Sequence, residues 1–442
     1  MSRYIINGGV PLFGEVSIRG AKNAAYKQII ASLLSSATTH LSNIPQISDV
    51  KITESIAKSL GAHITHIGRH SLEICTPQIT SSVVPHGTGE KSRTSFIFAA
   101  PLLARTGKAT IPIPGGDKLG TRPLDRLFDC FSQMNIHTHQ KGDLLFFETD
   151  KILPTTYKFP KPSHTVTEVV LMTAIFASGT TTLTNAAQEP EIDDLIDMLN
   201  SMGANIKRLP TEPGTIIIQG VPVLDGAKHQ VISDRNEAVT FACAALATKG
   251  SINILRINPE IIQIFLKTIT SMGARVEAGK DELTVSWHQP LKAVHIETTP
   301  EPGFMTDWQP VFSVVLSQAV GSSSIVERVW PSRFQHLKDL ASMDCRYQLF
   351  NPQVENPESY YFFNQESDSQ DYFHGAKIYG PANLKPAKFT INDLRSGASL
   401  TLAALSAPGT SIIDKVEYIE RGYENLAHRL KALGAAIEYI KT

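Results

Sequence analysis

Charged residues recur at the starts of the apolar, helix-length segments of this sequence. These residues are Lys22-Asn23, Arg93, Arg235, Asp307 and Asp393-Leu394-Arg395. A helix N-terminus carries free N–H groups and a partial positive charge, so a basic side chain there is unfavourable unless an anion compensates it. Any one of them could equally be a capping or solvent-exposed residue. Their repetition at equivalent positions favours a shared site that binds phosphate and carboxylate groups of a small polyanionic substrate.

A second candidate site is the segment 112–123, which reads Pro-Ile-Pro-Gly-Gly-Asp-Lys-Leu-Gly-Thr-Arg-Pro. Its three glycines give it flexible joints and its three prolines stiffen its ends. Most glycine-rich loops are only turns. Asp117 and Arg122 add a carboxyl and a guanidinium group, so the segment could also be a lid that closes over a bound ligand.

These candidate residues are embedded in an internal repeat. The string Ser-Leu-Gly-Ala-His-Ile at 59–64 returns in related form along the chain, with its glycine position at 61, 135, 203, 273, 344 and 434. The spacing is about seventy residues, and such a period indicates a repeated structural unit. The last interval is about twenty residues longer, and the excess falls in 351–375, which we expect to form an inserted hairpin or loop.

Each repeat is predicted to contain one amphipathic helix that ends at this glycine position and one helix that is apolar on nearly all sides. The apolar helices are expected at Lys22–Ser36, Arg93–Thr106, Thr165–Ser178, Arg235–Lys249, Asp307–Val320 and Asp393–Ala407. Strands rich in Thr, Ile and Val follow them, most often after a glycine. The pattern predicts an α/β protein with two domains of three repeats, in which the sheets lie outside and the apolar helices inside. The expected domains are 1–21 with 230–442, and 22–229.

Composition excludes several classes of function. The 442 residues contain 41 Lys and Arg against 42 Asp and Glu, a formal net charge of -1, which disfavours a nucleic-acid or membrane-surface protein. The four cysteines are scattered, and no His, Cys or carboxylate cluster has the spacing of a metal site, so neither a metal nor another cofactor is expected. The N-terminus lacks the apolar segment of a signal peptide. A cytoplasmic protein is expected.

Several motifs, taken together, resemble those of the UDP-N-acetylglucosamine 1-carboxyvinyltransferases, which are enolpyruvyl transferases. They are Gly20-Ala21-Lys22-Asn23-Ala24-Ala25, Pro114-Gly115-Gly116-Asp117 with Gly120 and Arg122-Pro123, Glu189-Pro190-Glu191-Ile192, Thr306-Asp307, Ser332-Arg333-Phe334, Asp393-Leu394-Arg395 and Ile419-Glu420-Arg421-Gly422-Tyr423-Glu424. They occur in the family's order over nearly the whole chain. The resemblance implies the family's two-domain inside-out α/β barrel, which agrees with the repeat. It also implies transfer of enolpyruvate from phosphoenolpyruvate to the 3-hydroxyl of UDP-N-acetylglucosamine, with release of phosphate.

The resemblance also implies roles for individual residues. Asp117 in the lid, Asp307 as the base for the sugar hydroxyl, Lys22 and Arg395 would form the catalytic group. Lys22, Arg122 and Arg421 would bind the phosphate of phosphoenolpyruvate, while Arg333, Arg395 and Arg93 would complete the basic site and bind its carboxylate. Asp393 would support these cations. The UDP-sugar positions are Asn23, Pro123, Leu124, Asp125, Ser163 and Thr165.

The sequence departs from the family pattern at four positions. Asp117 stands where most members have a reactive Cys, and this change implies resistance to fosfomycin, which alkylates that thiolate. Leu127, His164 and Pro331 replace residues that are common in the family, and these changes bear on the acceptor. Two alternatives therefore stay open: an enolpyruvyl transferase that acts on another nucleotide or nucleotide sugar, and a non-catalytic protein that binds a UDP-sugar. The oligomeric state is not indicated.

Overall fold

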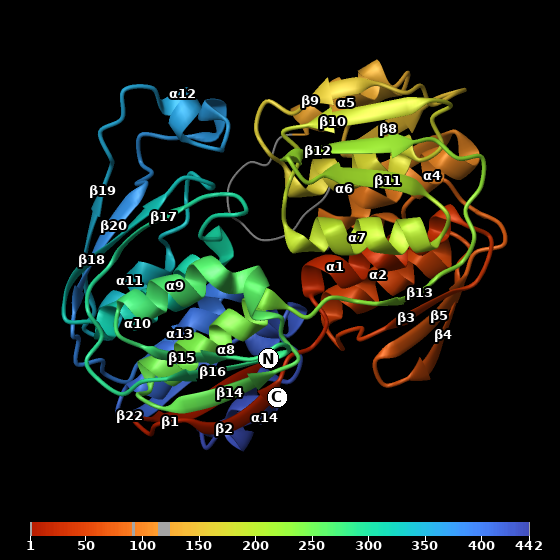
Figure 1. Cartoon of the computed structure of the whole chain (residues 1–442). Coiled ribbons are helices and arrows are strands. Elements are labelled where there is room, and N and C mark those ends of the chain that lie inside the picture. The colour runs from red at the N-terminus through yellow and green to blue at the C-terminus, as the bar shows by residue number, and fades with distance from the viewer. Residues whose placement is uncertain (1, 91–92, 114–123, 442) are drawn as a thin grey trace. The chain divides into compact units, whose positions relative to one another are not determined.

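The computed structural model of this chain describes residues 2–90, 93–113 and 124–441. The predicted lid at 112–123, apart from Pro112 and Ile113, lies outside the described residues. The described chain divides into two compact units (Figure 1). Unit 1 contains residues 2–19 and 233–441, and unit 2 contains residues 20–232 apart from the gaps given above. The expected domain division lies close to these units. That each part folds as an independent domain stays a prediction.

Each repeat forms one small sheet. The described chain has five four-stranded sheets and one three-stranded sheet, and none of the six closes into a barrel. In the sheets of the first five repeats the strand that follows the apolar helix pairs antiparallel with one strand of a hairpin, and the amphipathic helix connects that first strand to the hairpin. In the four-stranded sheets a short parallel strand completes the other edge. The expected α/β repeat with sheets outside and apolar helices inside is confirmed within each unit (Figure 1).

Unit 2 contains the first three repeats. Its inner helices are α1 (Lys22–Ala31) continued by η1 (Ser32–Leu34), η2 (Arg93–Phe98) continued by α4 (Ala99–Thr106), and α6 (His164–Ala174). Its other helices are α2 (Ser48–Ser59), α3 (His86–Gly89), α5 (Asp125–Gln133) and α7 (Pro190–Ser201). Its sheets, in spatial order, are β13 (Lys228–Gln230), β3 (Thr39–Ser42), β5 (Ser71–Cys75) and β4 (His63–Gly68); β6 (Lys108–Pro112), β8 (Leu144–Glu148) and β7 (His137–Lys141); and β11 (Asn205–Leu209), β12 (Glu212–Gln219), β10 (Thr180–Thr184) and β9 (Thr156–Lys158).

Unit 1 contains the other three repeats. Its inner helices are α8 (Arg235–Ala247), η4 (Thr306–Trp308) continued by α10 (Gln309–Gln318), and α13 (Leu394–Ser406). Its other helices are η3 (Pro259–Ile262) continued by α9 (Gln263–Ser271), α11 (His336–Ser342), α12 (Pro357–Tyr360), η5 (Gln365–Ser367), and η6 (Val416–Arg421) followed by α14 (Leu426–Ala432). Its sheets are β15 (Arg275–Ala278), β16 (Glu282–Ser286), β14 (Ser251–Leu255) and β2 (Phe13–Ser17); β17 (His295–Thr298), β18 (Gly321–Glu327), β20 (Gly375–Gly380) and β19 (Arg346–Phe350); and β21 (Lys388–Thr390), β22 (Gly409–Asp414), β1 (Ser2–Gly8) and β23 (Ala436–Lys441).

The repeated glycine position ends each amphipathic helix in the left-handed conformation, as the sequence predicts. The φ values are +112° at Gly61, +99° at Gly203, +103° at Gly273 and +99° at Gly434. In the two divergent copies Asn135 and Asp344 take the same conformation, with φ of +61° and +72°. Asn and Asp tolerate this region better than other residues with a side chain, so the repeat keeps its backbone although the glycine is lost.

The sixth sheet is completed by the first strand of the chain. β1 lies between β22 and β23 and pairs antiparallel with both, so that Ser2 lies opposite Lys441. In the other repeats this central position belongs to the second strand of the local hairpin. The sixth repeat ends before such a strand, and the N-terminal segment takes its place.

The segment 351–375 forms an extended hairpin connection between β19 and β20, which confirms the expected insertion. It contains α12 and η5 and its own aromatic cluster of Tyr361, Phe363 and His374. The residues between β19 and β20 add no strand to the fifth sheet, which keeps the strand order of the other repeats.

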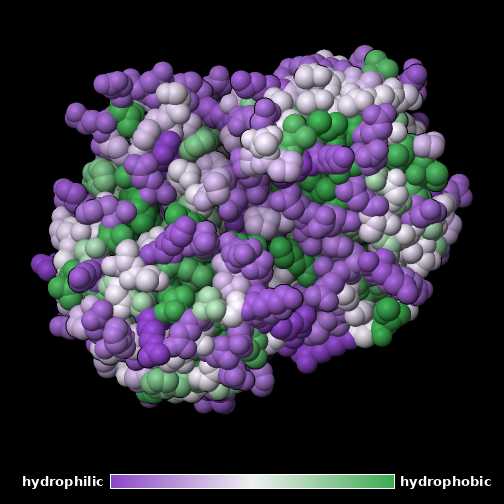
Figure 2. All heavy atoms as spheres, viewed as in Figure 1, coloured by the Kyte–Doolittle hydropathy of each residue, from purple (hydrophilic) through white to green (hydrophobic). Residues whose placement is uncertain are grey.

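The interior of each unit is made by its inner helices. In α8 every residue from Arg235 to Ala247 is buried, which explains why this helix is apolar on nearly all sides. On the face shown in Figure 2, hydrophobic residues occur in small groups between polar ones. The longest α-helices of the described chain, α8 and α13, have 13 residues each, too few to cross a membrane.

Candidate functional site

The inner helices of unit 1 bring the predicted acidic and basic residues together. α10 packs against both α8 and α13. Asp307 lies in η4, one turn before α10, and Arg395 is the second residue of α13. The carboxylate of Asp393 accepts a hydrogen bond from the N–H of Ser396 at 2.9 Å, so this residue caps α13 and fixes the turn that carries Arg395.

Asp307 binds two arginines through its two carboxylate oxygens. Arg333, from the loop before α11, donates from Nη2 to Oδ1 of Asp307 at 2.8 Å. Arg395 donates from Nη2 and Nε to Oδ2 at 3.2 and 3.4 Å. The side chains of the two arginines are 3% and 8% exposed, whereas that of Asp307 is 23% exposed. The cluster thus presents one partly accessible carboxylate beside two nearly buried guanidinium groups.

Arg395 is held in place by a further contact that the sequence does not indicate. Its Nη1 donates to the hydroxyl of Tyr423 at 3.0 Å, and this hydroxyl is also hydrogen-bonded to Thr240 at 2.8 Å. Burial opposes the charge of Arg395, but its attraction to Tyr423, Asp307 and Asp234 outweighs burial, so its pKa is raised. Arg395 therefore stays cationic, as a ligand for a carboxylate or phosphate must. Arg421 lies partly buried at the end of η6, two residues before Tyr423.

Arg235 begins another inner helix of unit 1. It is only 1% exposed, and it forms an ion pair with Glu301 and lies over the ring of Trp308. That several basic residues at these helix starts share one binding site stays a prediction. The partner of Arg235, Glu301, is 66 residues away in sequence and could not be found from the spacing.

The remaining predicted residues lie in unit 2, again at helix starts. Lys22 and Asn23 open α1, whose N-cap Ala21 provides no side-chain cap, and the Nζ of Lys22 is 2.9 Å from the buried carboxylate of Asp49. The rest of this set is placed as follows: Arg93 at the start of η2, Leu124 and Asp125 at the start of α5, and Ser163 and Thr165 at the start of α6. Asp117, Arg122 and Pro123 lie outside the described residues.

A buried cluster of charged residues connects α1 to the first turns of α6. Lys27 in α1 forms an ion pair with Glu168 in α6, and the two side chains are 1% and 0% exposed. His164 approaches both, with its Nε2 at 3.0 Å from the Nζ of Lys27 and 3.1 Å from Oε1 of Glu168. Burial raises the pKa of Glu168, while Lys27 acts to lower it. The departure from the family pattern at His164 is thus linked to a buried ion pair that the motifs did not reveal.

A buried neutral histidine next to the Asp307 cluster gives a pH-dependent prediction. His336 in α11 is 2% exposed, is hydrogen-bonded to Ser313, and has its pKa lowered to about 3 by burial and by the charge of Arg333. The unfolded chain takes up this proton near pH 6.5, so the contribution of His336 to stability is present above that pH and is lost as the pH falls toward 3. We expect His336 alone to lower the free energy of unfolding by about 1.4 kcal/mol for each pH unit that the pH falls in this range, relative to a variant without it. Denaturant titrations between pH 7 and 4 would measure the free energy of unfolding. In His336→Leu it should depend less on pH than in the wild type. The same pH dependence in both proteins would contradict the role of His336.

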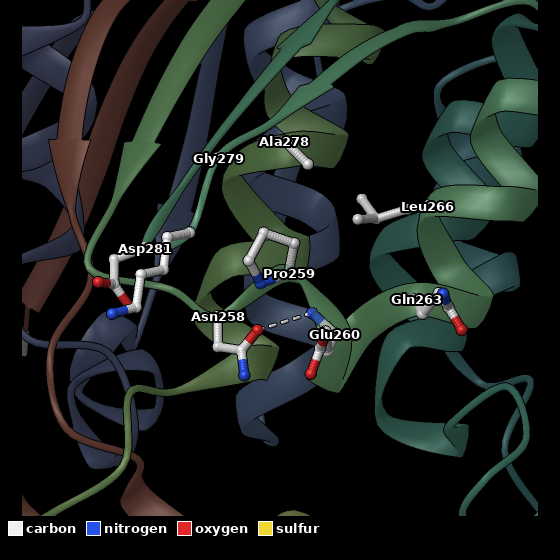
Figure 3. A pocket seen from close by; sticks show the side chains of 9 residues that line it. Asn258, Pro259, Glu260, Gln263, Leu266, Ala278, Gly279 and Asp281 are labelled. Carbon is white, nitrogen blue, oxygen red and sulfur yellow. Dashed lines mark hydrogen bonds between the residues drawn. The ribbon is translucent and has the colours of Figure 1, made fainter.

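One pocket lies apart from these residues. A cavity of about 490 Å³ lies between η3, the start of α9 and the β15–β16 hairpin (Figure 3). The side chain of Asn258 accepts a hydrogen bond from the N–H of Glu260 and caps η3, while Leu266 and Ala278 contribute apolar surface. The lining shares no residue with the Asp307 cluster. Among its polar side chains, Asn258 has a structural role as the cap of η3.

Among residues 2–90, 93–113 and 124–441, one group has side chains close enough together to hold a metal ion. It consists of His86, Glu90 and Asp143, all of which are exposed. His86 already contacts both carboxylates, and none of the three is a predicted catalytic or substrate-binding residue. These three residues therefore give no reason to propose a metal ion among the predicted catalytic and substrate-binding residues.

Comparison with solved structures defines the class of fold. The enolpyruvyl transferase NikO from Streptomyces tendae superposes with a TM-score of 0.86 at 23% identity, covering 100% of this chain and 99% of that one. The EPSP synthase from Acinetobacter baumannii gives a TM-score of 0.74 at 18% identity and covers all of both chains. The chain has the enolpyruvyl transferase fold.

Sequence comparison then gives the family. Residues 6–430 match the family model of EPSP synthase (3-phosphoshikimate 1-carboxyvinyltransferase), and this chain belongs to that enolpyruvyl transferase family. The UDP-N-acetylglucosamine 1-carboxyvinyltransferase 2 of Clostridium acetobutylicum is 36% identical over 438 residues, which is 99% of each chain. The UDP-N-acetylglucosamine 1-carboxyvinyltransferases of Rhodopseudomonas palustris and Idiomarina loihiensis are 35% and 34% identical and cover 100% of both chains.

Proposed function

We propose that this chain transfers the enolpyruvyl group of phosphoenolpyruvate to the 3-hydroxyl of UDP-N-acetylglucosamine and releases phosphate, the first committed step of peptidoglycan precursor synthesis. Full-length similarity to relatives that carry this activity in their names supports the acceptor. This similarity does not favour an enzyme that acts on another nucleotide sugar, nor a non-catalytic protein that binds a UDP-sugar. The observation that carries the proposal is the Asp307 cluster, in which a partly exposed carboxylate lies beside Arg333 and Arg395.

The chemistry requires a base, an acid and cations. The sugar 3-hydroxyl loses its proton to Asp307 and attacks C2 of phosphoenolpyruvate, while C3 gains a proton, for which Asp117 is the proposed donor. The tetrahedral ketal then loses a proton from C3, and its bond to the phosphate oxygen breaks. Phosphate leaves, and the enolpyruvyl ether remains.

The cations hold the anionic substrate during these steps. We propose Lys22, Arg122 and Arg421 for the phosphate of phosphoenolpyruvate, and Arg333, Arg395 and Arg93 for its carboxylate. Charge-assisted hydrogen bonds from Arg395 are available in a fixed direction because Tyr423 holds the guanidinium group. Asp393 supports these cations indirectly, because it caps α13, the helix that carries Arg395. The UDP-sugar is assigned to Asn23, Pro123, Leu124, Asp125, Ser163 and Thr165.

We further propose that the protein acts in the cytoplasm on small molecules alone. Cys75, Cys130, Cys243 and Cys345 are free thiols, as is usual in a reducing compartment. Burial raises the pKa of Cys130, Cys243 and Cys345, so these thiols are protonated and unreactive at neutral pH.

Inorganic phosphate released by the purified protein tests the proposal. We expect release that requires both phosphoenolpyruvate and UDP-N-acetylglucosamine and that continues in the presence of fosfomycin, because a carboxyl at position 117 is a poor nucleophile toward the epoxide. Asp117→Cys is the matched variant, and it should become sensitive to the drug. If phosphate is released only with a different nucleotide sugar, that sugar is the acceptor and UDP-N-acetylglucosamine is not. Binding of UDP-N-acetylglucosamine without any release would favour the non-catalytic alternative.

A further inference from the structure

Glu327 is a buried carboxylate for which the proposed reaction has no use. It is the last residue of β18, its side chain is 0% exposed, and it lies between the two chain segments that provide Asp307 and Arg333. Burial raises the pKa of Glu327, whereas hydrogen bonds from Thr298, Val329 and Thr306 and the charge of Arg333 act to lower it. A carboxyl buried at this cost needs a compensating role.

One oxygen of Glu327 contacts the segment that carries Asp307. The hydroxyl of Thr306 donates to Oε2 of Glu327 at 2.9 Å in a buried environment. Thr306 begins η4 and immediately precedes Asp307, so this bond fixes the backbone turn from which the Asp307 carboxylate projects.

The other oxygen contacts the segment that carries Arg333. The N–H groups of Val329 and Trp330 donate to Oε1 of Glu327 at 2.8 and 3.0 Å. The chain then passes through the buried Pro331 to Arg333, whose guanidinium group binds Asp307. The two segments, more than twenty residues apart, are therefore both hydrogen-bonded to one side chain.

We infer that Glu327 is a positioning residue that sets the distance between Asp307 and Arg333, and so the orientation of the proposed base toward the sugar hydroxyl. The inference rests on the proposed function for its kinetic consequence. Glu327 contacts neither substrate nor reacting atoms in this role. Its effect should appear in the chemical step, because a displacement of about 1 Å of a catalytic group can lower a rate about 10²-fold.

The test compares two threonines that donate to the same carboxyl group. Thr306→Val removes the hydrogen bond next to Asp307. Thr298→Val removes one from β17, which carries neither site residue, although the hydroxyl of Thr298 also accepts a bond from the N–H of Arg328. Both side chains are buried, so the two variants should lose similar stability. We expect Thr306→Val to lower kcat at least ~10-fold with little change in the KM for phosphoenolpyruvate, and Thr298→Val to keep kcat within about threefold of the wild type.

Variants of Glu327 itself distinguish the effect of its hydrogen bonds from the effect of its charge. Glu327→Ala should lower kcat about 10²-fold, and Glu327→Gln, which can still accept from the two N–H groups and bond to Thr306, should restore most of it. Equal kcat values per folded molecule for Thr306→Val, Thr298→Val and the wild type, with losses of stability only, would overturn the inference. A wild-type protein without turnover would instead contradict the proposed function, so the two failures can be told apart.

Discussion

Asp307→Asn is expected to lower the rate of phosphate release about 10³-fold while the protein remains folded. The amide has the shape of the carboxylate but cannot take the proton of the attacking hydroxyl. Arg333 and Arg395 lose their anionic partner in this variant, so their donors become more available to an anionic ligand. The affinity for phosphoenolpyruvate should therefore be kept or increased, and only kcat should fall.

Steady-state phosphate release together with calorimetric titration of phosphoenolpyruvate measures both quantities. Asp414→Asn is the matched control, because Asp414 also binds two basic residues, Arg3 and Lys388, but does so on β22 of the sixth sheet. It should retain wild-type kinetics. An Asp307→Asn variant with nearly full kcat would exclude Asp307 as the base.

Lys27→Met is expected to destabilise the protein by ~3–5 kcal/mol, the largest loss of stability that we predict. The substitution keeps the aliphatic stem but leaves Glu168 without its charged partner in an environment where it has no exposed surface. Replacement of both groups, Lys27→Met with Glu168→Leu, removes the uncompensated carboxyl and should recover most of the loss, since a buried ion pair contributes little beyond an apolar pair.

The dependence on pH gives this prediction a second test. The pKa of Glu168 in the folded protein is raised above its ordinary value of 4.5. A raised carboxyl pKa makes the folded state bind a proton that the unfolded state has lost, so stability falls as the pH rises from about 4.5 through the folded pKa. Without Lys27, which lowers that pKa, the fall should continue to a higher pH. Urea denaturation at pH 5 and pH 8 would measure it. Lys158→Met, at an exposed position of the same unit, should change stability by less than about 0.5 kcal/mol.

The architecture was predictable because the same local sequence signals recur in each repeat. The left-handed residue after each amphipathic helix is visible as Gly61, Gly203, Gly273 and Gly434, and its spacing alone reveals six units. Helix ends were less certain: α6 ends at Ala174, four residues before the expected end. The role of β1 in the sixth sheet could not be found, because its partners lie more than 400 residues away and no local pattern records that pairing.

The site was predictable only in part, for a related reason. The motifs identified Asp307, Arg333 and Arg395, which the structure places in one cluster. One motif contains Tyr423 but gives it no role, and no motif contains Glu327, because a hydrogen bond between distant segments leaves no periodic trace. An acidic residue directly after two apolar strand residues, as in Ile325-Val326-Glu327, is the one signal that could have indicated Glu327.

The place of β1 in the sixth sheet has a consequence for synthesis on the ribosome. All of unit 2 comes from between residues 20 and 232, so it can fold while the rest of the chain is still being made. Unit 1 cannot be completed in the same way, since β1 is made more than 400 residues before its partners β22 and β23. β2 can pair with β14 much earlier, but β1 stays without its strand partners until β22 and β23 have been made. The sixth sheet is thus expected to form after unit 2 has folded.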